Sequence, residues 1–216
     1  MPPKGYLQKL REICDKHGIL LIFDEVICGW GRMGSVFAAQ EFGVVPDMMT
    51  MAKATTNGVV PMGVVACKDE MYDAVMDASP MGAVELFHGY TYSGIPVSVA
   101  AALAVQDIFE KEDIFNRVKE LVPYFQKSIF SLKDLESVAN IRGQGLMAGI
   151  DMKLNTKPGK AGFETFKSCY EVGVNFKATG DCLIIAPQFI CEKKHIDEIV
   201  DKVRTGIQNY QKNQKN

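Results

Sequence analysis

The sequence lacks the features that would place it in several common functional classes. Its 216 residues include 24 basic and 26 acidic residues, and the formal net charge of −2 gives no electrostatic reason to expect nucleic acid or an anionic membrane as a partner. No apolar run is long enough to span a bilayer, and the first residues do not form a signal peptide. We therefore expect a cytoplasmic protein without a membrane partner.

Paired metal-ligand spacings are also missing. The six cysteines never stand in a CxxC spacing, and the three histidines are scattered singly. We predict no metal site and no disulfide framework, and we expect most cysteines to be small buried side chains.

What is present is the pattern of a globular α/β protein. Hydrophobic residues make up 47% of the chain, which is enough for a sizeable core. Helical periodicity and helix-ending residues predict helices over 4–17, 68–77, 96–110, 114–132, 163–171 and 195–210. Short apolar or alternating runs predict strands over 19–23, 48–52, 63–67, 138–142, 146–152, 174–177 and 182–186.

The change in the order of these elements predicts two domains. Residues 1–133 are expected to belong to a large α/β domain, and residues 134–216 to a small α+β domain. The continuous apolar run 19–23 predicts a strand of a parallel sheet, buried on both faces. Pro123 is expected to kink or split the helix that contains it.

Two of the predicted strands are followed by charged residues of opposite sign. Asp24 follows the strand over 19–23, and Lys53 follows the strand over 48–52. The carboxyl ends of strands form the edge at which an α/β sheet presents reactive groups. Pyridoxal phosphate (PLP) needs an amine that links to its aldehyde and a carboxylate that pairs with its protonated ring nitrogen. We expect Asp24 to be buried after five apolar residues, where a cationic ring would offset the cost of the charge.

A competing motif is the GxGxxG pattern of Gly29 to Gly34, which is typical of dinucleotide-binding folds. In those folds the first glycine stands at the strand end, the motif opens a helix, and the next strand ends in an acidic residue. Here residues 24–28 intervene and the next strand is followed by Lys53. We therefore interpret the glycines as a tight loop.

Several segments, taken in order, resemble class III (ω-amino acid) aminotransferases, which are PLP enzymes of fold type I. They are FDEVICGWGRMG, PDMMTMAKATTNG, VPMGVV, HGYTYSGIPV and IRGQGLMAGI, and the run PPKGYLQKLREICDKHGILLIFDEV is most similar to the β-alanine–pyruvate transaminase branch. The resemblance extends over nearly the whole chain. It implies the α/β fold of a PLP-dependent transferase of fold type I, with an incomplete large domain plus the small C-terminal α+β domain.

The resemblance also implies roles for individual residues. Lys53 corresponds to the catalytic lysine that binds PLP covalently, and Asp24 to the partner of the pyridine nitrogen. Val26 would pack on one face of the ring. Thr91 would reach across a dimer interface to the phosphate of the cofactor of the other subunit. The implied reaction moves an amino group from an ω-amino acid such as β-alanine to pyruvate or a similar keto acid.

Two positions depart from the family pattern. Ile95 precedes Pro96 where similar enzymes have histidine, a change expected to affect only loop packing. Lys177 stands where similar enzymes commonly place an arginine that grips the substrate carboxylate. A lysine keeps the charge but loses the rigid two-donor fork. Three alternatives follow. Carboxylate binding is weaker, an amino-sulfonate or another small anionic amine is preferred, or Lys177 is a solvent-exposed lysine in a degenerate site.

The N-terminal half that such enzymes carry before the FDEV strand is not in this sequence. That half supplies the phosphate-binding glycine/serine turn, and we find no substitute for it. About three strands of the large sheet remain, so we expect an exposed edge and face. The expected partners are a second copy of the chain in a homodimer or the missing half. The alternatives are a catalytically silent half-chain and a transaminase for 4-aminobutyrate, taurine or a diamine.

Overall fold

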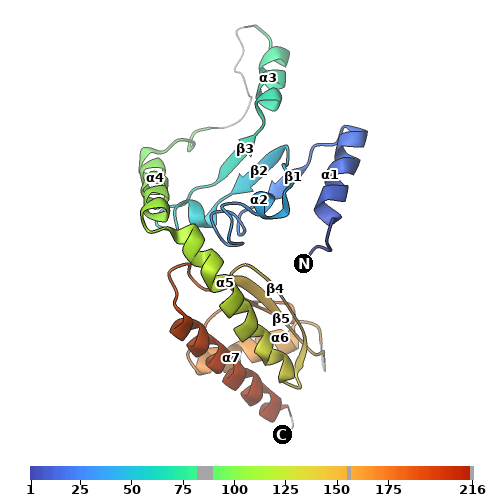
Figure 1. The fold of residues 1–216 in the computed structure, drawn as a ribbon, viewed down its shortest axis with the longest axis vertical. Helices are drawn as coiled ribbons and strands as arrows, with labels where there is room; N and C mark the ends of the chain where they lie inside the picture. The colour runs from blue at the N-terminus through green and yellow to red at the C-terminus, as the bar shows by residue number, and fades with distance from the viewer. Residues whose placement is uncertain (82–89, 155–156, 215–216) are drawn as a thin grey trace. The chain divides into compact units, whose positions relative to one another are not determined.

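The computed structural model describes residues 1–81, 90–154 and 157–214. Contacts between Cα atoms divide the chain into two compact units (Figure 1). The N-terminal unit comprises Pro2–Gly31 and Ser35–Asp113, and the C-terminal unit comprises Met1, Arg32–Gly34 and Ile114–Asn216. The main division between the units falls after Asp113. The domain boundary near residue 133 stays a prediction.

The N-terminal unit is built on a three-stranded sheet of order β1-β2-β3, in which β1 pairs with β2 in parallel and β2 with β3 antiparallel. The sheet holds three strands, as the sequence predicts. The elements of this unit are α1 (Tyr6–His17), β1 (Ile22–Asp24), α2 (Ala38–Phe42), β2 (Met48–Met51), the 3₁₀ helix η1 (Lys53–Thr55), β3 (Val64–Cys67), α3 (Asp69–Ala78) and α4 (Pro96–Lys111). The short helix α2 is not among the predicted elements.

The prediction that the first strand is buried on both faces is wrong. Ile22 is 53% exposed, and Leu20, which precedes the strand, is 57% exposed. The reason is the position of β1 at the edge of the sheet, where only β2 pairs with it. Val65 of β3 is likewise 67% exposed, which confirms the expected exposure of apolar surface in this unit.

Helix α1 shows how the local sequence sets its own end. Gly18 follows the helix in the left-handed conformation, with a φ of 63°. The N–H of Gly18 donates to the Asp15 carbonyl and the N–H of Ile19 to the Cys14 carbonyl, which satisfies two carbonyls of the last turn. The apolar face of α1 buries Cys14, which packs with Leu21 and Val44.

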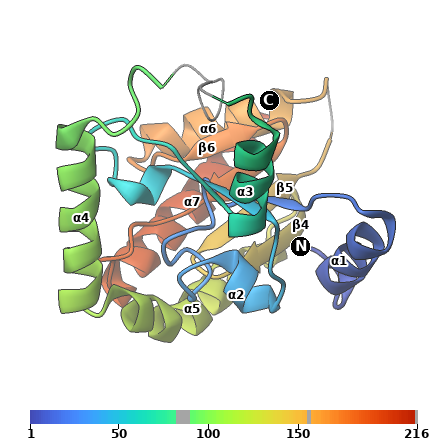
Figure 2. The same ribbon diagram turned by 90° about the horizontal axis from the view of Figure 1, so that it is seen from above.

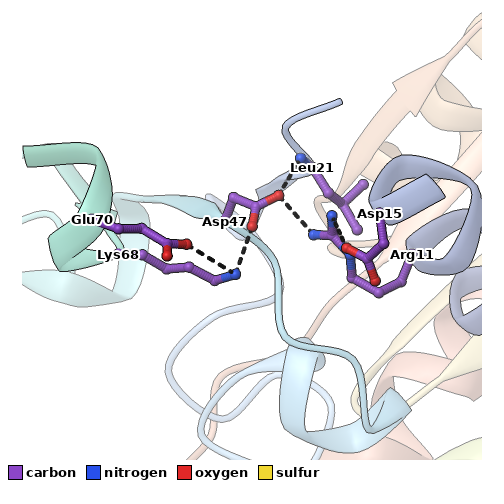
Figure 3. A network of polar contacts seen from close by, with 6 residues as sticks. All are labelled: Arg11, Asp15, Leu21, Asp47, Lys68 and Glu70. Carbon is purple, nitrogen blue, oxygen red and sulfur yellow. Dashed lines mark hydrogen bonds and ion pairs between the residues drawn. The ribbon is translucent and has the colours of Figure 1, made fainter. Parts of the chain in front are cut away.

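Asp47 ties the elements around the sheet together (Figure 3). Its carboxylate accepts hydrogen bonds from the Leu21 N–H and the Arg11 guanidinium, each at 2.7 Å, and pairs with the Lys68 ammonium at 2.7 Å. Arg11 comes from α1, Leu21 precedes β1, and Lys68 follows β3. The hydrogen bond from Leu21, together with the two cations, holds the pKa of the Asp47 carboxyl well below its usual range.

The C-terminal unit contains a four-stranded antiparallel sheet of order β4-β5-β7-β6, packed with three helices. In Figure 2, α6 lies beside β6. The elements are α5 (Ile114–Phe130), the 3₁₀ helix η2 (Ser131–Asp134), β4 (Val138–Gln144), β5 (Met147–Met152), α6 (Lys160–Glu171), β6 (Lys177–Thr179), β7 (Cys182–Ile185) and α7 (Lys193–Asn213).

Buried and partly buried residues alternate along the strands of this sheet, so one face of the sheet is covered and the other is open. On β5, Ala148, Ile150 and Met152 are buried, whereas the residues between them are only partly buried. Strand β7 repeats the pattern, with Leu183 and Ile185 buried. The covered face and the helices form the core of the unit.

Helix α5 continues through Pro123 as one element, so the helix is not split. Leu121, Phe125 and Ile129 keep the apolar face of α5 buried on both sides of the proline. This burial compensates for the backbone hydrogen bond that a proline cannot donate.

The second glycine of the GQG segment is needed for a close approach of two backbone segments. Gly145 has a φ of 57°, and a Cβ atom on it would lie 2.2 Å from the carbonyl oxygen of Arg32. The N–H of Leu146 donates to that same oxygen at 2.9 Å. This turn is therefore also the contact through which Arg32–Gly34 joins the C-terminal unit.

Candidate active site

The structure brings the predicted carboxylate and the predicted amine to the same edge of one parallel strand pair. Strand β1 ends at Asp24, which is paired in register with Thr50 of β2. Strand β2 ends at Met51, and Lys53 begins η1 two residues later. Because β1 and β2 are parallel, both functional groups stand at the carboxyl ends of their strands.

The Asp24 carboxylate is held by short-range hydrogen bonds. Its Oδ1 accepts from the Val26 N–H at 3.0 Å and from the Thr50 hydroxyl at 3.3 Å. Asp24 is exposed in this structure, so the expected burial of its carboxylate is wrong for the chain as described. The cause is again the edge position of β1, which has one neighbouring strand.

The segment that follows Lys53 is firmly anchored although Lys53 itself is exposed. Thr55 and Thr56 are 3% and 2% exposed. The Thr55 hydroxyl accepts from the Trp30 indole N–H at 3.0 Å, and the Thr56 hydroxyl donates to the Val60 carbonyl at 2.6 Å. Lys53 makes no ion pair with any residue of the described ranges. The amine thus stands on a fixed turn with its functional group accessible.

Val26 belongs to the turn that leaves β1, and its neighbour Glu25 fixes that turn. Glu25 is 2% exposed, and its carboxylate accepts from the N–H groups of Ala38 and Ala39 at 3.0 and 2.7 Å. The Glu25 carbonyl also accepts from the Gly29 N–H at 2.9 Å. Sequence reasoning missed this role of Glu25, because α2, which it caps, has too few residues to give a periodic signal.

The glycine motif that follows forms a loop, as predicted. The segment after β1 runs through turns and bends, and α2 begins only at Ala38. Trp30, Gly31 and Gly34 have φ values of 63°, 104° and 97°. The Trp30 and Phe37 rings pack with centroids 5.0 Å apart. This loop lacks the strand–turn–helix geometry that a dinucleotide site requires.

Thr91 and Lys177 lie on separate units. Thr91 is exposed in the turn before α4, in the same unit as Asp24 and Lys53, and residues 88 and 89 of its motif lie outside the described residues. Lys177 is exposed on β6, the edge strand of the C-terminal sheet, where it pairs in register with Ile184.

The donor set of the N-terminal unit fits PLP. The accessible Lys53 amine suits the aldehyde of the cofactor, and the Asp24 carboxylate, oriented by two hydrogen bonds, suits its ring nitrogen. The adjacent Val26 side chain suits one face of the ring. Within the described ranges, no group of three or more His, Cys, Asp or Glu side chains could hold a metal ion. The same ranges contain no helix that is both long and apolar enough to cross a bilayer.

Comparison with known proteins gives one consistent result. The family model "Aminotransferase class-III" matches residues 1–207. An omega-aminotransferase of Caulobacter vibrioides is 47% identical over 207 residues, which are 94% of this chain and 46% of that protein. The beta-alanine–pyruvate aminotransferase of Pseudomonas aeruginosa is 43% identical over 209 residues, which are 96% of this chain and 47% of that protein.

Solved structures agree with the sequence relatives. A structure described as a transaminase with L-ala superposes with a TM-score of 0.93 at 31% identity, covering 99% of this chain and 52% of the other. The predicted fold class is confirmed by this match. The chain spans about half the length of the curated relatives it matches. It belongs to the class III aminotransferase family.

Proposed function

We propose that this chain carries the amine-bearing part of a PLP-dependent aminotransferase that moves an amino group from an ω-amino acid, such as β-alanine, to pyruvate or a similar keto acid. One observation carries the proposal: Asp24 and Lys53 share the carboxyl edge of the β1–β2 pair. The names of the relatives, an omega-aminotransferase and a beta-alanine–pyruvate aminotransferase, support the substrate class.

Each residue then has a defined task. PLP, when bound, supplies an electron sink for the carbon that gives up or accepts the amino group. The Asp24 carboxylate keeps the proton on the ring nitrogen, and the hydrogen bonds from Val26 and Thr50 fix its orientation. The Val26 side chain covers one face of the ring. The Lys53 amine binds the cofactor and moves a proton at the substrate carbon that bears nitrogen.

Thr91 and Lys177 each have a proposed role as well. Thr91 contributes its hydroxyl to the phosphate of a cofactor held by a second subunit, so the proposal includes a homodimer. Lys177 pairs with the substrate carboxylate as a point charge, since its ammonium cannot form the two parallel hydrogen bonds of an arginine. A domain boundary near residue 133 and a cytoplasmic location remain predictions.

A second candidate follows from the length of the chain. The relatives are about twice as long, and the glycine/serine turn for the cofactor phosphate is predicted to belong to their other half. The second candidate is a half-chain that is catalytically silent until it meets that half. The choice of amine donor, including 4-aminobutyrate, taurine or a diamine, stays open in both cases.

Titration of the purified chain with PLP tests the proposal. We expect a visible absorption band of lysine-bound PLP that is lost in Lys53→Ala and kept in Lys16→Ala, which removes an exposed lysine of α1. Addition of β-alanine should shift the band. If Lys53→Ala binds PLP as the wild type does, the assignment of Lys53 is wrong. If the wild type gives only the weak band of surface lysines, the silent half-chain is the better description.

A further inference from the structure

Trp30 holds a backbone conformation that bulky side chains rarely adopt. Its φ of 63° lies in the left-handed region, which costs free energy for a residue with a Cβ atom. Such a conformation persists only where the surrounding contacts over-determine it, and functional sites are where it is often found. Two contacts of the indole ring compensate here. Its N–H donates to the Thr55 hydroxyl at 3.0 Å, and the ring packs with that of Phe37.

The hydrogen bond joins the two segments that carry the reactive groups. Trp30 lies in the loop that leaves β1 after Asp24, and Thr55 lies in η1, which begins at Lys53. The register of the β1–β2 pair ends at Asp24 and Thr50, before Lys53 is reached. The indole N–H therefore connects the two segments beyond the end of the strand ladder.

The loop that presents Trp30 is fixed by contacts of its own. Glu25 is buried, and its carboxylate accepts from the N–H groups of Ala38 and Ala39. The Glu25 carbonyl accepts from the Gly29 N–H, and a Cβ atom on Gly29 would lie 2.9 Å from that carbonyl oxygen. Trp30 follows this close approach directly, so the loop that starts at β1 sets the position of the indole.

Thr55 closes the turn that contains Lys53. Its N–H donates to the Ala52 carbonyl at 2.6 Å, so residues 52–55 form one closed turn. Thr55 is buried, whereas Lys53 is exposed. Packing of the lysine side chain therefore contributes little to fixing this turn, and the buried Thr55 side chain fixes it instead.

We propose that Trp30 and Thr55 are positioning residues for Lys53, and that their hydrogen bond sets the place of the Lys53 amine relative to the Asp24 carboxylate. A ligand that must reach both groups at once binds more tightly when they are held at a suitable separation, because less conformational freedom is lost on binding. This inference rests on the proposed function, in which PLP links to Lys53 and pairs with Asp24.

The first measurement uses the full chain without any cofactor. Hydrogen exchange of the residue-55 amide, followed by NMR and expressed as protection, reports opening of the turn around Lys53. Trp30→Phe keeps an aromatic ring beside Phe37 and removes the N–H, so protection should fall about fivefold, the size of one net hydrogen bond. Thr55→Val removes the hydroxyl and should give the same fall. Thr55→Ser keeps the hydroxyl and should stay close to the wild type.

A double variant identifies the pair. Because both changes remove the same hydrogen bond, Trp30→Phe combined with Thr55→Val should lower protection no further than either change alone. The matched control is Thr56→Val, which removes a second buried hydroxyl of the same segment, one that donates to the Val60 carbonyl. The effects of Thr56→Val and Trp30→Phe should add.

The second measurement asks whether the hydrogen bond acts on the lysine. The full chain is mixed with subsaturating PLP, the adduct is trapped with borohydride, and peptide mass spectrometry compares Lys53 with Lys16, an exposed lysine of α1. The wild type should label Lys53 in preference to Lys16. Trp30→Phe and Thr55→Val should each lower the Lys53 label about two- to fivefold and leave the Lys16 label unchanged. Thr55→Ser should restore it.

The outcomes distinguish the inference from the function on which it rests. Unchanged protection in Trp30→Phe and Thr55→Val overturns the inference whatever the cofactor does. Reduced protection with an unchanged preference for Lys53 also overturns it, because the contact would then be structural only. If the wild type labels Lys53 no more than Lys16, the proposed role of Lys53 fails first and the positioning role fails with it. Should Trp30→Phe fold poorly, Thr55→Val against Thr55→Ser decides.

Discussion

Replacing Asp47 with asparagine removes one negative charge from the network of Figure 3 while keeping the size of the side chain. The Asp47 side chain is 8% exposed, and those of its partners Arg11 and Lys68 are 17% and 41% exposed. Removing one member of a buried ion pair costs about 3–5 kcal/mol. Because Lys68 reaches solvent and can rehydrate, we expect a loss near the lower end, about 3 kcal/mol of the free energy of unfolding.

The assay uses the single tryptophan of the chain. Trp30 lies in the N-terminal unit, so its fluorescence during urea unfolding reports on the unit that contains the network. The matched control is Asp15→Asn, since Asp15 also pairs with Arg11, at 2.7 Å, but is 64% exposed. The control should cost no more than about 1 kcal/mol. Equal losses in both variants would refute the argument that burial makes Asp47 the important partner.

The same variant predicts a change in pH dependence. The folded-state pKa of Asp47 is lowered, so its stabilisation is fully present above the unfolded value of about 3.9 and is lost as the pH falls through the folded value. Wild-type stability should therefore decline more steeply below about pH 4 than that of Asp47→Asn. Parallel pH curves for the two proteins would show that the carboxylate is not preferentially ionised in the folded state.

Three further results are expected. Gly145→Ala should lower the free energy of unfolding of the C-terminal unit, followed by circular dichroism, by about 1–3 kcal/mol more than Gly180→Ala. Both glycines have a positive φ, but only the Gly145 Cβ would meet backbone atoms, and equal losses would contradict the overlap. Burial raises the pKa of the Cys169 thiol to about 12. A thiol reagent at neutral pH should therefore label exposed Cys67 first and Cys169 only after unfolding. Early labelling of Cys169 would contradict its burial. Lys177→Arg should tighten butyrate binding about threefold, because a guanidinium can donate two parallel hydrogen bonds, and unchanged binding would contradict its proposed role.

The sequence by itself determined where the reactive groups stand along the chain. An apolar run that ends at Asp24 and another that ends just before Lys53 are local patterns. Strand β2 (Met48–Met51) forms where its pattern predicts it, whereas β1 (Ile22–Asp24) begins three residues later than the predicted strand over 19–23. Helix α4 begins at Pro96, whose backbone angle is restricted, and helix α1 ends before Gly18, whose backbone is permissive. Both boundaries follow in the same way from local sequence. Such features are readable because each depends on neighbours within one element.

Other features were decided only by tertiary structure. Burial of β1 was predicted wrongly because exposure depends on how many strands pair with it, and here only β2 does. Asp47 gains its importance from Arg11 and Lys68, which are distant from it in sequence and meet it only in the folded unit.

The surroundings of Lys177 have the same origin. The strand order β4-β5-β7-β6 places Ile184 of β7 in register beside Lys177 of β6. No local sequence pattern contains that order. The chemistry of each side chain is written in the sequence, whereas the distances between side chains of different elements arise from strand register and packing.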